Sequence, residues 1–178
     1  MNTAALHTMN SPVSCYKLPT FKGWLALSNS RNSETKNLII HEAHYVISSN
    51  MESVILLSET LQMECENNRI KDDISMHIRL AIVEALNNIV EHAFKSNGNK
   101  EIDVYITFFE KNIRIRLTDN GLPNHNGVRP VDQTNFSRED AMSIPDGGYG
   151  LSIIHQIMDR VDYKRKNNIN IMTMEKFL

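Results

Sequence analysis

Residues 74–94 read ISMHIRLAIVEALNNIVEHAF, and this stretch decides the fold around which the rest of the chain is arranged. At about 100° per residue its apolar side chains fall in one broad arc, which predicts an amphipathic helix packed on a core. That arc contains Ile78, Ala81, Ile82, Ala85, Leu86 and Ile89. Glu84, Asn88 and His92 form a separate line at its edge, at i, i+4 and i+8. The helix therefore holds a carboxylate, an amide and an imidazole at a core boundary.

The segment before this helix predicts a strand and a further helix. Leu38 to Ile47 is rich in β-forming residues. Ser49-Asn50-Met51-Glu52 has the Ser-x-x-Glu form of a capping box, so a helix is expected to begin there. Its apolar face recurs at three- and four-residue steps in Val54, Leu57, Leu61 and Cys65. Residues 1–36 show no sustained period, and we predict a partly ordered N-terminal extension followed by one domain over residues 37–178.

Two segments of alternating hydrophobicity, Glu101–Phe109 and Asn112–Thr118, predict a β-hairpin. One face of the second strand carries Ile113, Ile115 and Leu117. The same parity places Asp119 on that apolar face, where a carboxylate needs a hydrogen-bond donor. Asp119-Asn120-Gly121 is also a strong turn sequence, and a turn alone would explain it.

Residues 122–146 show no periodicity, and an irregular segment of this length in a compact domain predicts a lid over a site. The segment is followed by Gly147-Gly148-Tyr149-Gly150 and by an amphipathic helix marked by Leu151, Ile154, Met158 and Val161. A glycine-rich backbone that opens a helix favours anions, because free N–H groups and the helix dipole point at the same place. A plain loop-to-helix junction would explain the same glycines. Strands near Asp162–Lys164 and Ile169–Met174 complete the expected fold.

Composition excludes several classes of function. The chain has 178 residues, of which 41% are hydrophobic, as expected for one folding unit. Lys and Arg number 19 against 21 Asp and Glu, so we expect no direct nucleic-acid partner. We expect a cytoplasmic protein without membrane contact, because no run reaches about 18 apolar residues and the N-terminus does not resemble a signal peptide. Cys15 and Cys65 lack the spacing of a zinc or redox site.

Three of these features together resemble the GHKL ATPase superfamily, which includes gyrase, Hsp90, MutL and histidine kinases. Residues 84–94, EALNNIVEHAF, resemble its N-box. Asp119-Asn120-Gly121 resembles its first glycine box, and Gly148-Tyr149-Gly150-Leu151 resembles its second. The closing helix and strand of the family resemble Met158–Val161 and Asn170–Met172. The resemblance is strongest to the bacterial anti-sigma-factor serine kinases.

The resemblance implies both a fold and its ligands. The fold is an α/β two-layer sandwich, the Bergerat ATP-binding fold, in which a mixed, mainly antiparallel sheet is covered by helices on one face. The ligands are ATP and Mg²⁺. Asn88 would offer its side-chain oxygen to Mg²⁺, and Asn87 is a competing candidate whose outward helical angle argues against it. Glu84 would be the general base that accepts a proton from the attacking hydroxyl, or would orient a water.

Other residues would bind the nucleotide itself. Asp119 would accept a hydrogen bond from the adenine amino group, and Gly121 would let the base approach the backbone. Gly148 and Gly150, followed by Leu151, would bring backbone N–H groups to the phosphates. The lid residues Arg129 and Arg138 are candidate charge partners for the phosphates. His92 is expected to pack beside the site.

The expected activity is that of the stand-alone branch, since neither a phosphoacceptor helix pair nor a transducer domain is recognised around the ATP domain. This branch implies a serine/threonine protein kinase that phosphorylates a STAS-domain anti-anti-sigma partner and sequesters a sigma factor or other regulator, with a homodimer as a further expectation. The intact Glu84 and Asn88 favour this enzyme. The alternative is a nucleotide-gated regulatory binding module with little or no kinase activity. Leu122-Pro123 stands where many relatives carry a further glycine, and this difference favours the module.

Overall fold

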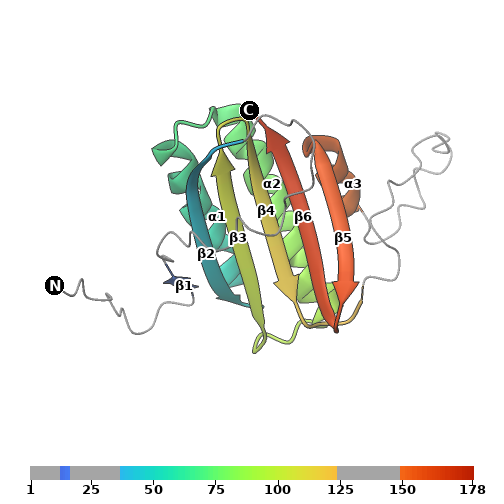
Figure 1. The fold of residues 1–178 in the computed structure, drawn as a ribbon. Coiled ribbons are helices and arrows are strands. Elements are labelled where there is room, and N and C mark those ends of the chain that lie inside the picture. The colour runs from blue at the N-terminus through green and yellow to red at the C-terminus, as the bar shows by residue number, and fades with distance from the viewer. Residues whose placement is uncertain (1–12, 17–36, 124–148) are drawn as a thin grey trace, which may run out of the picture.

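The computed structural model of the chain describes residues 13–16, 37–123 and 149–178, and within them six strands form one sheet in the order β1-β2-β3-β4-β6-β5. The strands are β1 (Val13–Tyr16), β2 (Ile39–Ser48), β3 (Glu101–Phe109), β4 (Asn112–Asp119), β5 (Arg160–Lys166) and β6 (Ile169–Phe177). The described α-helices are α1 (Met51–Asn67), α2 (Asp72–Asn88) and α3 (Tyr149–Ile157). All of them lie on one face of the sheet (Figure 1). The predicted α/β two-layer sandwich is confirmed.

Strand direction differs from the expectation in one respect. Every pair of neighbouring described strands is antiparallel, so this part of the sheet is not mixed. β1 lies within the predicted N-terminal extension and pairs with β2, with Val13 opposite Ile47 and Tyr16 opposite His44. A strand of four residues is too short to reveal a period of two in the sequence.

The core lies between the sheet and the helices, as predicted by the apolar arc of the helix and by the alternating apolar residues of the strands. Side chains that are no more than 1% exposed include Ile78, Ile82 and Leu86 of α2 and Ile113, Ile115 and Leu117 of β4. Burying each such side chain stabilises the fold by about 1.5 to 3 kcal/mol. The polar residues at the ends of α2 and β4 therefore adjoin buried core side chains.

The start of α1 corrects the predicted capping box by one residue. Asn50 is the N-cap, and its side chain accepts a hydrogen bond from the Ser53 N–H at 2.9 Å. Ser49 instead donates its hydroxyl to the Asn97 carbonyl at 2.5 Å and accepts from the Lys100 N–H at 3.1 Å. Ser49 therefore fixes the segment that enters β3, and Asn50 caps the helix.

The expected single helix over residues 74–94 consists of two helices. α2 ends at Asn88, and η2 (Ile89–Ala93) continues as a π-helix, in which the Phe94 N–H donates to the Ile89 carbonyl at 3.0 Å. A π-helix bonds each residue to the fifth along the chain and often occurs at functional sites. Residues after Asn88 therefore leave the line that Glu84 and Asn88 share.

α3 is shorter than its apolar pattern predicts. It ends at Ile157, and Val161 lies in β5 opposite Met174 of β6. Val161 is apolar because it packs on the core as part of a strand. Its three-residue spacing from Met158 matches a helical period only by coincidence. No helix in the described ranges is long and apolar enough to cross a membrane.

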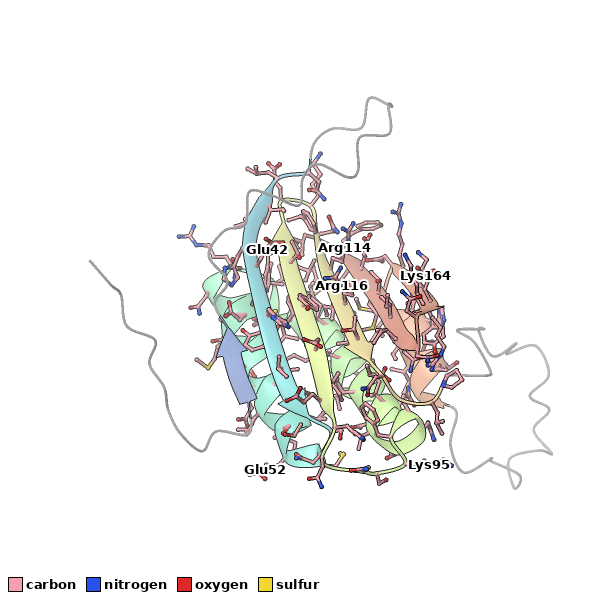
Figure 2. All side chains as sticks on the ribbon, turned by 60° about the horizontal axis from the view of Figure 1, so that its bottom comes forward. Glu42, Glu52, Lys95, Arg114, Arg116 and Lys164 are labelled. Atoms are coloured by element: carbon pink, nitrogen blue, oxygen red, sulfur yellow. The ribbon has the colours of Figure 1, made fainter. Side chains whose placement is uncertain are left out.

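The sheet face away from the helices is polar. Figure 2 shows Arg114 and Arg116 of β4 on this face. The Arg114 guanidinium contacts the Glu175 carboxylate at 2.6 Å, and the Arg116 guanidinium lies 4.4 Å from the centre of the Tyr105 ring. The apolar core is therefore confined to the helical side, where the candidate site also lies.

Candidate functional site

Glu84 and Asn88 lie one turn apart on α2, and the first turn of α3 packs directly against them. A Cβ added to Gly150 would lie 2.8 Å from Glu84 Oε2 and 3.3 Å from Asn88 Nδ2. A side chain at position 150 would therefore displace the Glu84 carboxylate. The structure thus brings together Glu84, Asn88 and Gly150, which are far apart in the sequence but were predicted to share a site.

The environment of Asn88 allows a test of whether the site suits Mg²⁺. Asn88 Nδ2 is buried and has no hydrogen-bond partner among the described residues. An unsatisfied buried polar atom costs about 1 to 3 kcal/mol, and rotation of the amide would present its oxygen at the same place. The described residues contain no group of three or more His, Cys, Asp or Glu that could hold a metal. The buried, unpartnered amide of Asn88 is what fits Mg²⁺, as one ligand with phosphate oxygens and water completing the set.

Asn87 is not as solvated as its helical angle predicts. Its side chain is half-buried, and Oδ1 is a buried atom without a hydrogen-bond partner in the described part of the chain. The expectation that it projects into solvent is therefore wrong. The two amides nevertheless differ in their position relative to α3, since the atoms nearest to a Cβ added at Gly150 belong to Glu84 and Asn88.

Asp119 ends β4 on the core face and is 7% exposed, as its parity predicts. Its Oδ1 accepts hydrogen bonds from the Gly121 N–H and from Asn170 Nδ2, both at 2.8 Å. Burial raises the pKa of Asp119 above its ordinary value, although both hydrogen bonds and the charge of Arg165 oppose this shift. Both of these hydrogen bonds go to Oδ1, and acceptance of a hydrogen bond from a ligand by Asp119 stays a prediction.

Asn170 is a site residue that the sequence reasoning did not assign. It lies directly opposite Asp119 in the β4 and β6 register and is 3% exposed. The signal was present, because Asn170 continues the buried parity of Met172 and Met174 to the end of β6. The same parity on β4 places Asp119 on the core face. The protein itself thus provides a donor to one of the two oxygens of the Asp119 carboxylate, through Asn170 Nδ2.

Gly121 is held by η2. A Cβ added to Gly121 would lie 2.7 Å from both the Cβ and the carbonyl oxygen of Ala93, and the Leu122 N–H donates to that same carbonyl at 2.9 Å. A glycine is therefore required here by packing. Contact of Gly121 with a nucleobase stays a prediction.

The remaining predicted residues differ in how they are placed. His92 lies on η2, is exposed, and takes part in none of the hydrogen bonds or ion pairs found among the described residues. Leu151 is half-buried on α3 and packs against the core. Gly148, Arg129, Arg138 and the predicted lid from residue 124 onward lie outside the described residues. Their roles stay predictions.

The chain is similar to known proteins of one family. Residues 47–176 match the family described as the histidine kinase-like ATPase domain. The serine-protein kinase RsbW of Listeria monocytogenes serotype 4a is 30% identical over 102 residues, which make up 57% of this chain and 64% of that protein. RsbW of Staphylococcus aureus strain MSSA476 is 30% identical over 113 residues, or 60% of this chain and 67% of that protein. This chain therefore spans about two thirds of the length of these relatives.

Solved structures show the same fold at lower identity. A Mycobacterium tuberculosis chain containing RsbU and RsbW domains superimposes with a TM-score of 0.55 at 14% identity, covering 77% of this chain and 32% of that chain. The SiaB-SiaC complex of Pseudomonas aeruginosa superimposes with a TM-score of 0.51 at 13% identity, covering 80% of this chain and 92% of that chain. The matched range, residues 47–176, includes every candidate site residue that the structure describes. This chain belongs to the histidine kinase-like ATPase domain family.

Proposed function

We propose that this chain is an ATP-dependent serine protein kinase of the anti-sigma type. The observation that carries the proposal is the close approach of Gly150 to Glu84 and Asn88. It sets the N-terminal turn of α3, where backbone N–H groups favour phosphate, beside a carboxylate and an amide. These are the groups that phosphoryl transfer from Mg·ATP needs, namely a proton acceptor and a metal ligand. Similarity to RsbW serine-protein kinases supports the proposal.

Three of the candidate site residues then have roles in nucleotide binding or phosphoryl transfer. Asp119 Oδ2 accepts a hydrogen bond from the adenine amino group. Asn88 binds Mg²⁺, which neutralises charge on the phosphates when it is bound. Glu84 accepts the proton of a substrate serine hydroxyl as its oxygen attacks the γ-phosphorus, and ADP carries away the electrons of the broken bond.

The proposed partners are a STAS-domain anti-anti-sigma protein, which carries the serine, and a sigma factor or other regulator, which the chain sequesters. Support for them comes from the similarity to RsbW and from the fold shared with a chain of the SiaB-SiaC complex. Phosphorylation adds charge to a surface serine, and a partner interface is sensitive to such a charge.

Nucleotide binding is tested first by thermal shift with ATP, with and without Mg²⁺. A ligand that binds only the folded protein raises its melting temperature. We expect a Mg²⁺-dependent rise that Asn88→Ala removes. Asn87→Ala is the matched control, since it removes the adjacent half-buried amide, and it should retain the rise. A Mg²⁺-dependent rise that survives Asn88→Ala and is lost in Asn87→Ala would reassign the metal ligand.

Phosphotransfer is tested with γ-labelled ATP and STAS-domain proteins from the same organism, with the product serine located by mass spectrometry. Glu84→Gln should bind ATP and lose about 100-fold or more in rate, because a general base contributes on this scale. Glu91→Gln is the control, since Glu91 is exposed on η2. Nucleotide-dependent partner binding without transfer by the unmodified chain would favour the regulatory binding module.

A further inference from the structure

Arg165 of β5 reaches the corner where the chain leaves β4. Its Nη1 donates a hydrogen bond to the Gly121 carbonyl at 3.0 Å and another to Asn170 Oδ1. The Tyr163 hydroxyl, two residues earlier on the same strand, also donates to Asn170 Oδ1 at 2.8 Å. Two donors from β5 thus converge on one side-chain oxygen of β6.

This convergence fixes the orientation of the Asn170 amide. A guanidinium has five N–H donors and no acceptor, so the atom that faces Arg165 must be the amide oxygen. Asn170 Nδ2 is therefore directed away, and it donates to Asp119 Oδ1 at 2.8 Å and to the Leu122 carbonyl at 3.0 Å. Reversing the amide would place its oxygen against the Asp119 carboxylate and its N–H groups against a cation.

The orientation of Asn170 in turn fixes the Asp119 carboxylate. Oδ1 accepts hydrogen bonds from Asn170 Nδ2 and from the Gly121 N–H. The carbonyl of Gly121 in turn accepts a hydrogen bond from Arg165. Hydrogen bonds that involve a charged group contribute about 1.5 to 3 kcal/mol each. Both oxygens of the carboxylate therefore have defined positions, and Oδ2 remains the ligand acceptor.

We propose that Arg165 is a positioning residue for nucleobase binding: through the Asn170 amide and the Gly121 carbonyl, it holds Asp119 Oδ2 in place to accept the 6-amino group of adenine. The inference rests on the proposed function, and Arg165 acts without touching the base. Arg165 is exposed, so its replacement removes this hydrogen-bond support without removing a core side chain.

The test compares two nucleotides in the full chain. ATP has the 6-amino group, and purine riboside triphosphate lacks it. In Arg165→Met, the affinity for ATP should fall about tenfold, the scale of one charge-assisted hydrogen bond, while the affinity for the purine analogue stays the same. Arg165→Lys should recover part of the loss, since lysine retains the charge but not the fixed fork. Lys166→Met, which removes the next exposed cation of β5, should leave both affinities unchanged.

A measurement without nucleotide separates this inference from the proposed function. Among the described residues, Arg165 is the charged side chain that lowers the pKa of Asp119. Titration followed by ¹³C NMR of the Asp119 carboxyl should therefore show a higher pKa in Arg165→Met than in the unmodified chain. ATP binding that does not respond to Arg165→Met, or that weakens equally for both nucleotides, would overturn the positioning role alone. A shifted pKa in a chain that binds neither nucleotide would overturn the proposed function and the positioning role together.

Discussion

Replacing Gly121 by alanine tests the contact between η2 and the corner that follows β4. The added Cβ would lie 2.7 Å from Ala93 Cβ, about 0.7 Å inside the 3.4 Å at which ordinary van der Waals contact begins. The same Cβ would lie 2.7 Å from the Ala93 carbonyl oxygen and 2.8 Å from its carbon. These are backbone atoms and cannot rotate away, so the two segments must separate.

The separation has two costs. Overpacking at a close contact destabilises a protein by about 1 to 3 kcal/mol. Moving Ala93 away also stretches the hydrogen bond from the Leu122 N–H, which is 2.9 Å long, and a lost hydrogen bond costs about 0.5 to 1.5 kcal/mol. The free energy of unfolding of Gly121→Ala should therefore fall by about 2 to 4 kcal/mol, or about 5 to 15 °C in melting temperature.

Equilibrium urea unfolding measures this change without any ligand. Gly98→Ala is the matched control, because the nearest atom to its added Cβ is Asn50 Cβ at an ordinary 3.8 Å. The control should be neutral or should gain up to about 1 kcal/mol, since alanine reduces the entropy of the unfolded chain. A loss in Gly121→Ala of less than about 0.5 kcal/mol, or no larger than in Gly98→Ala, would refute the packing argument.

Gly150→Ala should keep the free energy of unfolding within about 1 kcal/mol, because the crowded atoms are the side-chain ends of Glu84 and Asn88 and alanine favours a helix. Phosphotransfer should nevertheless slow about 100-fold, because the Glu84 carboxylate is displaced. Single-turnover transfer beside urea unfolding checks this, and an unchanged rate would contradict it. Burial raises the pKa of Asp119 in the folded chain, so the stability of the unmodified chain relative to Asp119→Asn should be greatest at acid pH and decline as pH rises through the raised pKa. Urea unfolding at several pH values measures the difference, and a constant value would count against the raised pKa. Asn50→Ala should cost about 1 kcal/mol through loss of the cap on the Ser53 N–H, measured in the same assay; equal stability would show that the cap contributes nothing.

The sequence predicts a site residue best where a polar residue occupies a position that the hydrophobic period assigns to the core. Strict alternation in β4 is enough to place Asp119 on the core face, because successive side chains of a strand point to opposite faces. The same reasoning reaches Asn170 from Met172 and Met174, although its contact with Asp119 depends on the pairing of β4 with β6. Strand pairing is a tertiary property, so one strand alone cannot indicate the partner of the carboxylate.

Other features depend on geometry that a period does not contain. A helical wheel assumes 3.6 residues per turn, and it cannot anticipate that η2 leaves this period after Asn88. For this reason His92 lies on an exposed surface although the wheel aligns it with Glu84. The contact of Gly150 with α2 is likewise a packing of distant segments, and only the family resemblance suggested that they meet.

Strand β5 forms one edge of the described sheet, and its composition affects how the protein behaves at high concentration. An edge strand offers unpaired N–H and C=O groups on which a strand from another molecule can be added, the first step of many aggregates. Five of the seven residues of β5 are charged, and four of these are Lys or Arg. Two copies of this edge would bring cations opposite one another, so self-association through β5 is opposed by repulsion and by the loss of hydration. Arg165, which donates hydrogen bonds to the Gly121 carbonyl and to Asn170, thus also contributes one of the charges that oppose self-association.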